Sequence, residues 1–286
     1  MTTEQQPPAP RRVRPKPRLV EVRGVERPTP DCVRVTLGGS ELAGYEMRGP
    51  AAHIKVLFAR EGEARTVLPE WGPEGPMLQA GQAMPPSRTY TPRAWDAAKQ
   101  ELTVEFMLHG EGLASTWAKS AKAGDVVAVT LPGGPYTVDP DADWYLLAGD
   151  ESALPAIETI LAELPAGKPA HVIVEVDGAG EERPVSAKHV KWLHRKAGEE
   201  SGVALEQALR GFEAPAGSGR VWVGCEAEVM RSIRKHLLFE RGMDRGEIHT
   251  HGYWKKGAAN HPDHDVGQEI SAASQPAFGA LSDDVT

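Results

Sequence analysis

Residues 144–164 read WYLLAGDESALPAIETILAEL. The opening WYLLAG is almost wholly apolar, as in a strand buried on both faces, and the segment after it has apolar residues at helical spacing with Pro155 in the first turn. Further strand candidates lie at 171–176, 189–194, 220–224 and 247–254, with helix candidates near 203–211 and 226–241. This alternation of strand and helix predicts an α/β domain with a parallel sheet.

The chain before this stretch has a different pattern. Short alternating or β-branched runs, separated by proline and glycine, read LVEVRGV, CVRVTL, HIKVLF, RTYTP, LTVEFML and DVVAVTL between residues 19 and 131. Many short strands of this kind indicate an antiparallel barrel or sandwich, and we expect a β-barrel. We place the β-domain at residues 19–140 and the α/β domain at 141–257, flanked by disordered tails at 1–18 and 258–286.

Composition excludes several classes of protein. The 286 residues suffice for two domains, and the net charge of −8 provides no basic field for nucleic acid. No run approaches the roughly 18 apolar residues of a membrane-spanning helix, and no apolar stretch follows the basic N-terminus, so we expect a cytoplasmic protein without a membrane partner. Cys32 and Cys225 lie far apart in sequence and cannot make a disulfide framework or a four-thiolate metal site.

The common nucleotide signatures are absent from the sequence. There is no G-x-x-x-x-G-K-[ST], and Gly178-Ala-Gly180 is followed by Arg183 where a third glycine should stand. These absences argue against a P-loop enzyme and against an ordinary Rossmann dehydrogenase. The HPDHD run at 261–265 lies in the expected tail without supporting residues, so we interpret it as a solvated segment and expect no metal site.

Residues 88–93, RTYTPR, combine two cations, an aromatic ring and hydroxyl groups. On an extended strand alternate side chains share a face, so Arg88 and Tyr90 would face one way and Thr89 and Thr91 the other. Arginine forms charge-assisted bonds to phosphate, tyrosine stacks on a ring and threonine bonds to a ring edge, which together suit a phosphorylated aromatic cofactor. A polar edge strand without a ligand is the alternative interpretation.

The RTYTPR segment resembles the R-x-Y-[ST] flavin signature of the ferredoxin-reductase-like superfamily. Further segments extend the resemblance to the siderophore-interacting protein family of FAD-dependent ferric-siderophore reductases. They are LHGEGLASTWA (108–118), LPGGPY (131–136), LAGDESALPAI (147–157), VWVGCEAEVMRSIRKHL (221–237) and GYWKKG (252–257). The resemblance covers nearly everything between the tails, and it implies an FAD-binding barrel followed by an NAD(P)H-binding α/β domain.

The same resemblance implies positions for the cofactor and the nucleotide. At the flavin and around the FAD phosphates it implies Arg88, Thr89, Tyr90, Thr91, His109, Gly110, Gly112, Ala114, Ser115 and Thr116. Along the NAD(P)H approach and beside the isoalloxazine it implies Asp150, Glu151, Ser152, Ala153, Glu226, Tyr253 and Trp254. Without the resemblance, the segment 150–152 reads as a helix N-cap and the two aromatics as core residues.

A bulky, often anionic ferric chelate calls for an open pocket lined with cations. Lys55, Lys255 and Lys256 are the candidates, and a solvated surface position is the alternative for each. One departure from the family pattern concerns the nucleotide site. Cys225 stands where family members commonly have glycine, which would require a backbone adjustment there.

The nucleotide preference stays open at this point. The second strand of the α/β domain ends at Glu175-Val-Asp177, and an acidic group there suits a ribose 2′-hydroxyl. Arg183 or Arg195 would instead suit a 2′-phosphate. Both NADH and NADPH are therefore candidate electron donors.

The activity that the resemblance implies is the transfer of electrons from NAD(P)H through FAD to a ferric siderophore. Hard oxygen ligands favour Fe(III), so reduction to Fe(II) weakens the chelate and frees the metal. We expect a monomer with no catalytic side chain beyond those that hold the flavin. A flavin reductase with a protein acceptor such as ferredoxin is the alternative, although the usual G-x-G-x-x-P turn is missing, and a siderophore-binding module without flavin is a third possibility.

Overall fold

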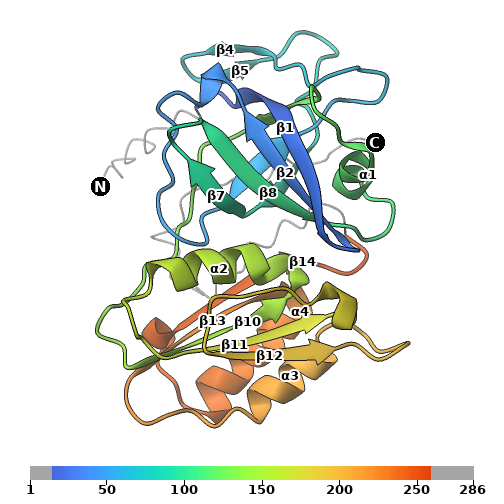
Figure 1. Ribbon diagram of the computed structural model, residues 1–286. Helices are drawn as coiled ribbons and strands as arrows, with labels where there is room; N and C mark the ends of the chain where they lie inside the picture. Colours follow the sequence, from blue (N-terminus) through green and yellow to red (C-terminus); the bar gives the residue numbers. More distant parts are fainter. Residues whose placement is uncertain (1–14, 259–286) are drawn as a thin grey trace, which may run out of the picture.

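The computed structural model describes residues 15–258, so the HPDHD run and nearly all of both expected tails lie outside the described residues. Two domains stack along the long axis of the molecule, a curled β-sheet and an α/β layer (Figure 1). The strands of the first sheet are β1 (Arg18–Thr29), β2 (Cys32–Gly38), β3 (Ile54–Leu57), β6 (Ser87–Tyr90), β7 (Pro92–Asp96), β8 (Glu101–Met107) and β9 (Val126–Val129). Their order is β6-β3-β9-β1-β2-β8-β7.

Strands β6 and β7 occupy opposite edges of this antiparallel sheet, yet a single residue, Thr91, separates them in sequence. The sheet must therefore curl until its two edges approach each other, and the expected barrel takes the form of a curled half-barrel. The RTYTP run, expected as one strand, is instead divided at Thr91 between the two edges. Period-two patterns show strands, but they carry no signal for a corner inside an extended run.

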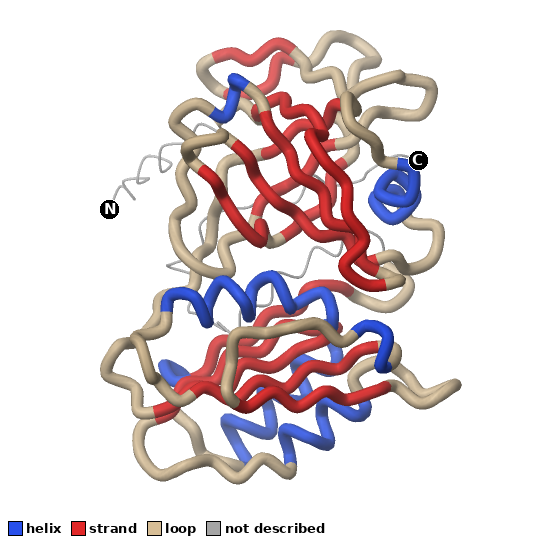
Figure 2. The backbone as a smooth tube through the Cα atoms, in the orientation of Figure 1, coloured by secondary structure: helices blue, strands red, loops and turns tan. Residues whose placement is uncertain are grey.

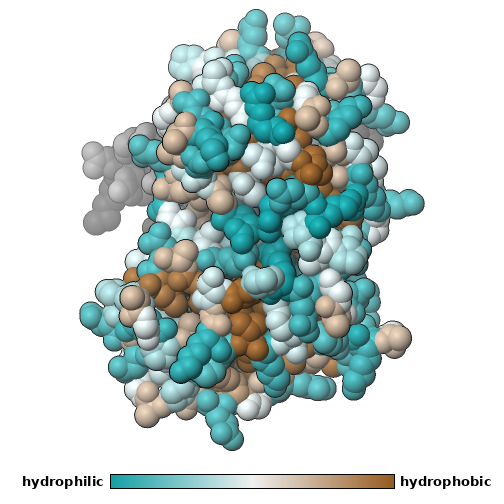
Figure 3. Space-filling model, viewed as in Figure 1, coloured by the Kyte–Doolittle hydropathy of each residue, from teal (hydrophilic) through white to brown (hydrophobic). Residues whose placement is uncertain are grey.

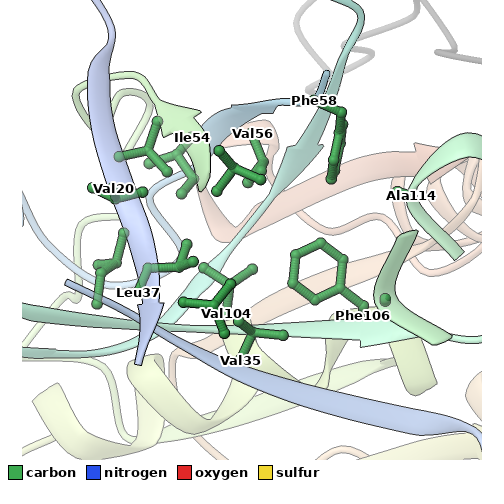
Figure 4. Packing of buried hydrophobic residues seen from close by; sticks show 14 of the residues in the cluster. Val20, Val35, Leu37, Ile54, Val56, Phe58, Val104, Phe106 and Ala114 are labelled. Atoms are coloured by element: carbon green, nitrogen blue, oxygen red, sulfur yellow. The ribbon is translucent and has the colours of Figure 1, made fainter. Parts of the chain in front are cut away.

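The core of the half-barrel is built from inward-facing side chains of successive strands. Val35 and Leu37 on β2 and Val104 and Phe106 on β8 are fully buried, as their alternating pattern predicts (Figure 4). Helix α1 (Leu113–Ser120) adds Ala114 to this core. The short hairpin of β4 (Glu70–Gly72) and β5 (Gly75–Met77) and the turn η1 (Ser40–Leu42) complete the domain.

The second sheet is parallel throughout, in the order β12-β11-β10-β13-β14. Its elements are β10 (Trp144–Asp150), η2 (Glu151–Ala153), α2 (Leu154–Glu163), β11 (Ala170–Val176), η3 (Ala179–Glu181), β12 (His189–His194), α3 (Val203–Arg210), β13 (Gly219–Glu226), α4 (Ala227–Lys235), η4 (His236–Glu240), η5 (Arg245–Glu247) and β14 (Ile248–Trp254). Helix α2 lies between this sheet and the half-barrel, and α3 and α4 cover the other face (Figures 1 and 2). Proline occupies the first turn of α2, as expected. Among the described helices none is long and apolar enough to cross a membrane.

A buried ion network joins the two domains. Glu105 on β8 has a fully buried side chain, which lies 2.8 Å from Arg34, 3.2 Å from Arg93 and 2.7 Å from Arg183. Arg93 and Arg183 also reach Glu158 on α2, at 2.9 and 3.0 Å. In the space-filling view, hydrophilic side chains gather on the surface between the two domains (Figure 3). The Arg183 side chain is only 6% exposed and belongs to this network, which argues against its expected role at a 2′-phosphate.

Candidate functional site

In the sheet, β11 and β12 lie on one side of β10, and β13 and β14 lie on the other, so the strand order changes direction between β10 and β13. Helix α2 covers one face of this sheet, and α3 and α4 cover the other (Figure 1). In open α/β sheets, ligands bind in the crevice at the carboxyl ends of strands at such a point. Gly149 and Gly224 are paired there, and a Cβ on Gly149 would overlap the carbonyl oxygen of Gly224. The two strand ends therefore approach as closely as only glycine allows.

Asp150, at the end of β10, lies at this point of the sheet and is 2% exposed. Its carboxylate accepts hydrogen bonds from Ser152 N at 3.0 Å and from Trp254 Nε1 at 2.8 Å. Burial, followed by the charge of Glu151, raises the pKa of Asp150 to about 7. The expected N-cap at 150–152 is thus present, and the same carboxylate also holds the end of β14.

Glu226, at the end of β13, caps helix α4. Its Oε2 accepts from the backbone N–H groups of Glu228 at 2.6 Å and Val229 at 3.1 Å. Its Oε1 accepts from Lys256 N at 3.3 Å. The carboxylate therefore links α4 to the segment after β14, and a contact with nucleotide stays a prediction.

The last strand faces the half-barrel with alternate side chains. His249 lies 5.2 Å from Tyr136 between ring centroids, and His251 lies 6.4 Å from His53. Tyr253 Oη lies 3.4 Å from Thr91 Oγ1, at the junction of β6 and β7. This contact brings the expected flavin strand and the expected nicotinamide crevice together. The alternating H-x-H-x-Y pattern of residues 249–253 indicates that these three side chains share one face of the last strand. The two histidines were not among the predicted site residues.

The expected flavin strand, β6, places its side chains on two faces. Tyr90 packs on Phe106 at 4.5 Å between centroids, and burial raises the pKa of its hydroxyl. Arg88 donates to Ser87 O at 2.8 Å, and Thr89 is exposed opposite Lys55 of β3. The pairing puts one of the three expected substrate lysines beside the flavin strand.

The other two lysines follow β14 and each has a carboxylate partner. Lys255 lies 3.6 Å from Glu228, and Lys256 lies 2.6 Å from Glu200. Both ion pairs are solvent-exposed on at least one side, so they hold these cations weakly.

The expected phosphate loop leads into α1. His109, Gly110 and Gly112 are exposed, and α1 begins at Leu113 with Gly112 as its N-cap residue, which provides no side-chain cap. Ser115 Oγ is buried and makes no hydrogen bond within residues 15–258, whereas Thr116 is exposed. An uncapped helix N-terminus beside a buried unpaired hydroxyl fits the diphosphate of FAD.

Ala114 and Cys225 both have buried side chains. The Ala114 side chain is 5% exposed and packs in the half-barrel core, and a contact of its backbone with the FAD phosphates stays a prediction. Cys225 points into the core beside α3 and α4, and its backbone is not left-handed. The close approach falls on Gly224 instead, and the sheet register slips by one residue after Cys225.

Arg195, directly after β12, is held by carboxylates. Its Nη2 and Nη1 bind both oxygens of Glu151, at 2.6 and 3.0 Å. Glu175 is fully buried and accepts from Gly202 N at 2.7 Å and Leu205 N at 2.9 Å, where α3 begins. Glu175 is thus a structural cap and not the ribose ligand that the sequence allowed. Ala153 is fully buried.

A curled antiparallel half-barrel followed by a doubly wound parallel sheet is the fold of the ferredoxin-reductase-like structures. Family models match in the same order, the siderophore-interacting FAD-binding domain at residues 21–136 and the siderophore-interacting protein at 142–257. The chain belongs to the siderophore-interacting protein family.

Individual curated proteins and a solved structure are also similar to this chain. The chain is 33% identical to the ferric vibriobactin reductase ViuB of Vibrio cholerae, over 84% of this chain and 90% of that protein. It is 32% identical to an NADPH-dependent ferric-chelate reductase of Escherichia coli, over 86% of this chain and 96% of that protein. A siderophore utilization protein from T. fusca superimposes with a TM-score of 0.75 at 38% identity, over 87% of this chain and 96% of that one.

Proposed function

We propose that this protein is an FAD-dependent reductase that passes electrons from NAD(P)H to ferric siderophores and so releases Fe(II). The observation that carries the proposal is the contact between Thr91 and Tyr253, because it joins the flavin strand to the end of the nucleotide sheet. The relatives named above are reductases of ferric vibriobactin and of a ferric chelate. Bound FAD would supply the chemistry, accepting a hydride from the nicotinamide and releasing electrons one at a time to Fe(III).

The chain itself binds and orients. The N-terminus of α1 and Ser115 Oγ would hold the FAD diphosphate, and Arg88 would add a charge-assisted bond. Asp150 accepts a hydrogen bond from Trp254 at the end of β14. This bond would keep Trp254 and its neighbour Tyr253 beside the expected nicotinamide site. No acid–base side chain is required for hydride transfer, and none is assigned.

The substrate approaches the flavin from solvent in this proposal. Lys55, Lys255 and Lys256 would attract the anionic chelate, and the weak ion pairs of the last two can open at small cost. The iron is part of the substrate in this proposal. Within residues 15–258 no group of three or more His, Cys, Asp or Glu side chains is arranged to hold a metal ion. A cytoplasmic location, which the two free, buried cysteines support, and a monomeric state complete the proposal.

An anaerobic visible spectrum of the purified protein tests the proposal. NADH or NADPH is added first, followed by a ferric hydroxamate or catecholate and an Fe(II)-specific dye. A flavin spectrum that bleaches with nucleotide and recovers with chelate, as Fe(II) appears, is the expected result. Flavin that bleaches but ignores every chelate would favour a protein acceptor, and no flavin after addition of FAD would overturn the assignment.

A further inference from the structure

Arg195 follows β12 directly, at the carboxyl ends of β11 and β12, where a nucleotide 2′-phosphate would be expected. All three of its guanidinium nitrogens face carboxylates. Besides the bidentate pair with Glu151, its Nε lies 3.3 Å from Asp177 and its Nη1 lies 3.4 Å from Glu175. The side chain is only 11% exposed, so these contacts occupy most of its surface.

Negative charges outnumber positive charges around the Arg195 guanidinium. One guanidinium faces three carboxylates, and the buried Glu175 is also bound to two backbone N–H groups of α3. Asp177 is the most accessible of the three, with 69% of its side chain exposed. A carboxylate in that position after the second strand can accept a hydrogen bond from a ribose 2′-hydroxyl.

We propose that the nucleotide site selects NADH over NADPH, and that Asp177 and Glu151 set this preference. The inference rests on the proposed function, because it assumes that a nicotinamide nucleotide binds in this crevice. A 2′-phosphate carries about −1.5 to −2 charges at neutral pH and would meet a cluster that is already negative. Arg195 would bind it only by giving up its bidentate pair with Glu151, whereas NADH places a hydroxyl there and leaves the pair intact.

The preference is tested on the FAD-loaded protein by two readouts. The first is kcat/KM for NADH and for NADPH with one ferric hydroxamate, for which we expect NADH to be favoured by about tenfold or more. The second is the dissociation constant of each nucleotide, which does not depend on turnover. Replacing Asp177→Asn and Glu151→Gln together should weaken the preference for NADH by about tenfold, which lowers the NADH-to-NADPH ratio of kcat/KM and raises the NADH-to-NADPH ratio of dissociation constants.

Glu182→Gln is the matched control. Glu182 is an exposed carboxylate at the same end of the sheet, but it pairs with His194 at 2.7 Å and does not contact Arg195. In the Glu182→Gln variant, the preference for NADH over NADPH should stay within about twofold of that of the original protein. Tighter NADPH binding, or an equal change in Glu182→Gln, would overturn the inference. Tighter NADH binding without reduction of any chelate would support the preference and defeat the proposed function.

Discussion

Trp254, the last residue of β14, donates its indole N–H to Oδ2 of Asp150, the last residue of β10, at 2.8 Å. Strand β13 lies between the two, so this bond spans the carboxyl ends of three neighbouring strands. The hydrogen-bond partners of the carboxylate, Trp254 and Ser152, are all donors, which favours the ionised form. Burial and the charge of Glu151 oppose ionisation and prevail, raising the pKa of Asp150 to about 7.

This titration predicts a pH dependence of stability. The pKa of Asp150 is about 7 in the folded protein, above the value of roughly 3.9 for an unfolded chain, so the folded state binds more protons between these limits. The contribution of Asp150 to the free energy of unfolding therefore falls as the pH rises from about 4 to about 7. Asp150→Asn should lose this slope in urea unfolding at pH 5 and pH 8, while the exposed Asp141→Asn keeps it. An unchanged slope in Asp150→Asn would contradict the assignment.

His249 predicts the opposite pH dependence. Burial lowers the pKa of His249 to about 4, below the roughly 6.5 of an unfolded histidine. The unfolded state therefore binds more protons in this range, and the free energy of unfolding falls as the pH drops from about 6.5 to about 4. His249→Gln should flatten this acid limb in urea unfolding. The exposed His194→Gln serves as the control, and a flattening as large in that variant would count against burial as the cause.

Arg88 provides a test of the flavin site. Arg88→Ala should weaken FAD binding by about tenfold or more, because a charge-assisted bond to phosphate contributes about 1.5–3 kcal/mol. The ratio of flavin to protein absorbance after gel filtration measures the effect, and circular dichroism checks that the fold persists. Arg23→Ala is the matched control, since Arg23 is an exposed arginine of β1 that pairs with Glu21. Full flavin content in Arg88→Ala would remove this residue from the site.

The ion network between the domains predicts a large stability effect. Glu105→Gln leaves three arginines facing an uncharged, fully buried amide, and breaking such a network costs about 3 kcal/mol. Glu26→Gln removes an exposed partner of Arg34 and should cost less than about 1 kcal/mol. Chemical unfolding of the two variants compares a buried with an exposed member of the same network. Equal losses would mean that burial does not govern this interface.

Much of the candidate site was predictable because its residues are neighbours in sequence. The RTYTPR run and the segment 150–153 are each a run of consecutive residues, so the chemistry of each can be read from the sequence alone. The break at Thr91 was not predictable, because it depends on how the two edges of a sheet meet. The carboxylate and backbone partners of Arg195 and Glu175 could not be predicted either, because these partners lie on other strands and helices.

By itself the sequence determined the two domains, the strands and helices, and the family, because apolar periodicity and short motifs are local properties of the chain. Tertiary structure alone decided which charges meet. Glu105 and Glu158 come from different domains yet share Arg93 and Arg183, and Glu151 reaches Arg195 across two strand ends. Electrostatic contacts act through space, so a buried arginine at an interface and an arginine offered to a phosphate look alike in sequence and differ only in the partners that folding brings to them.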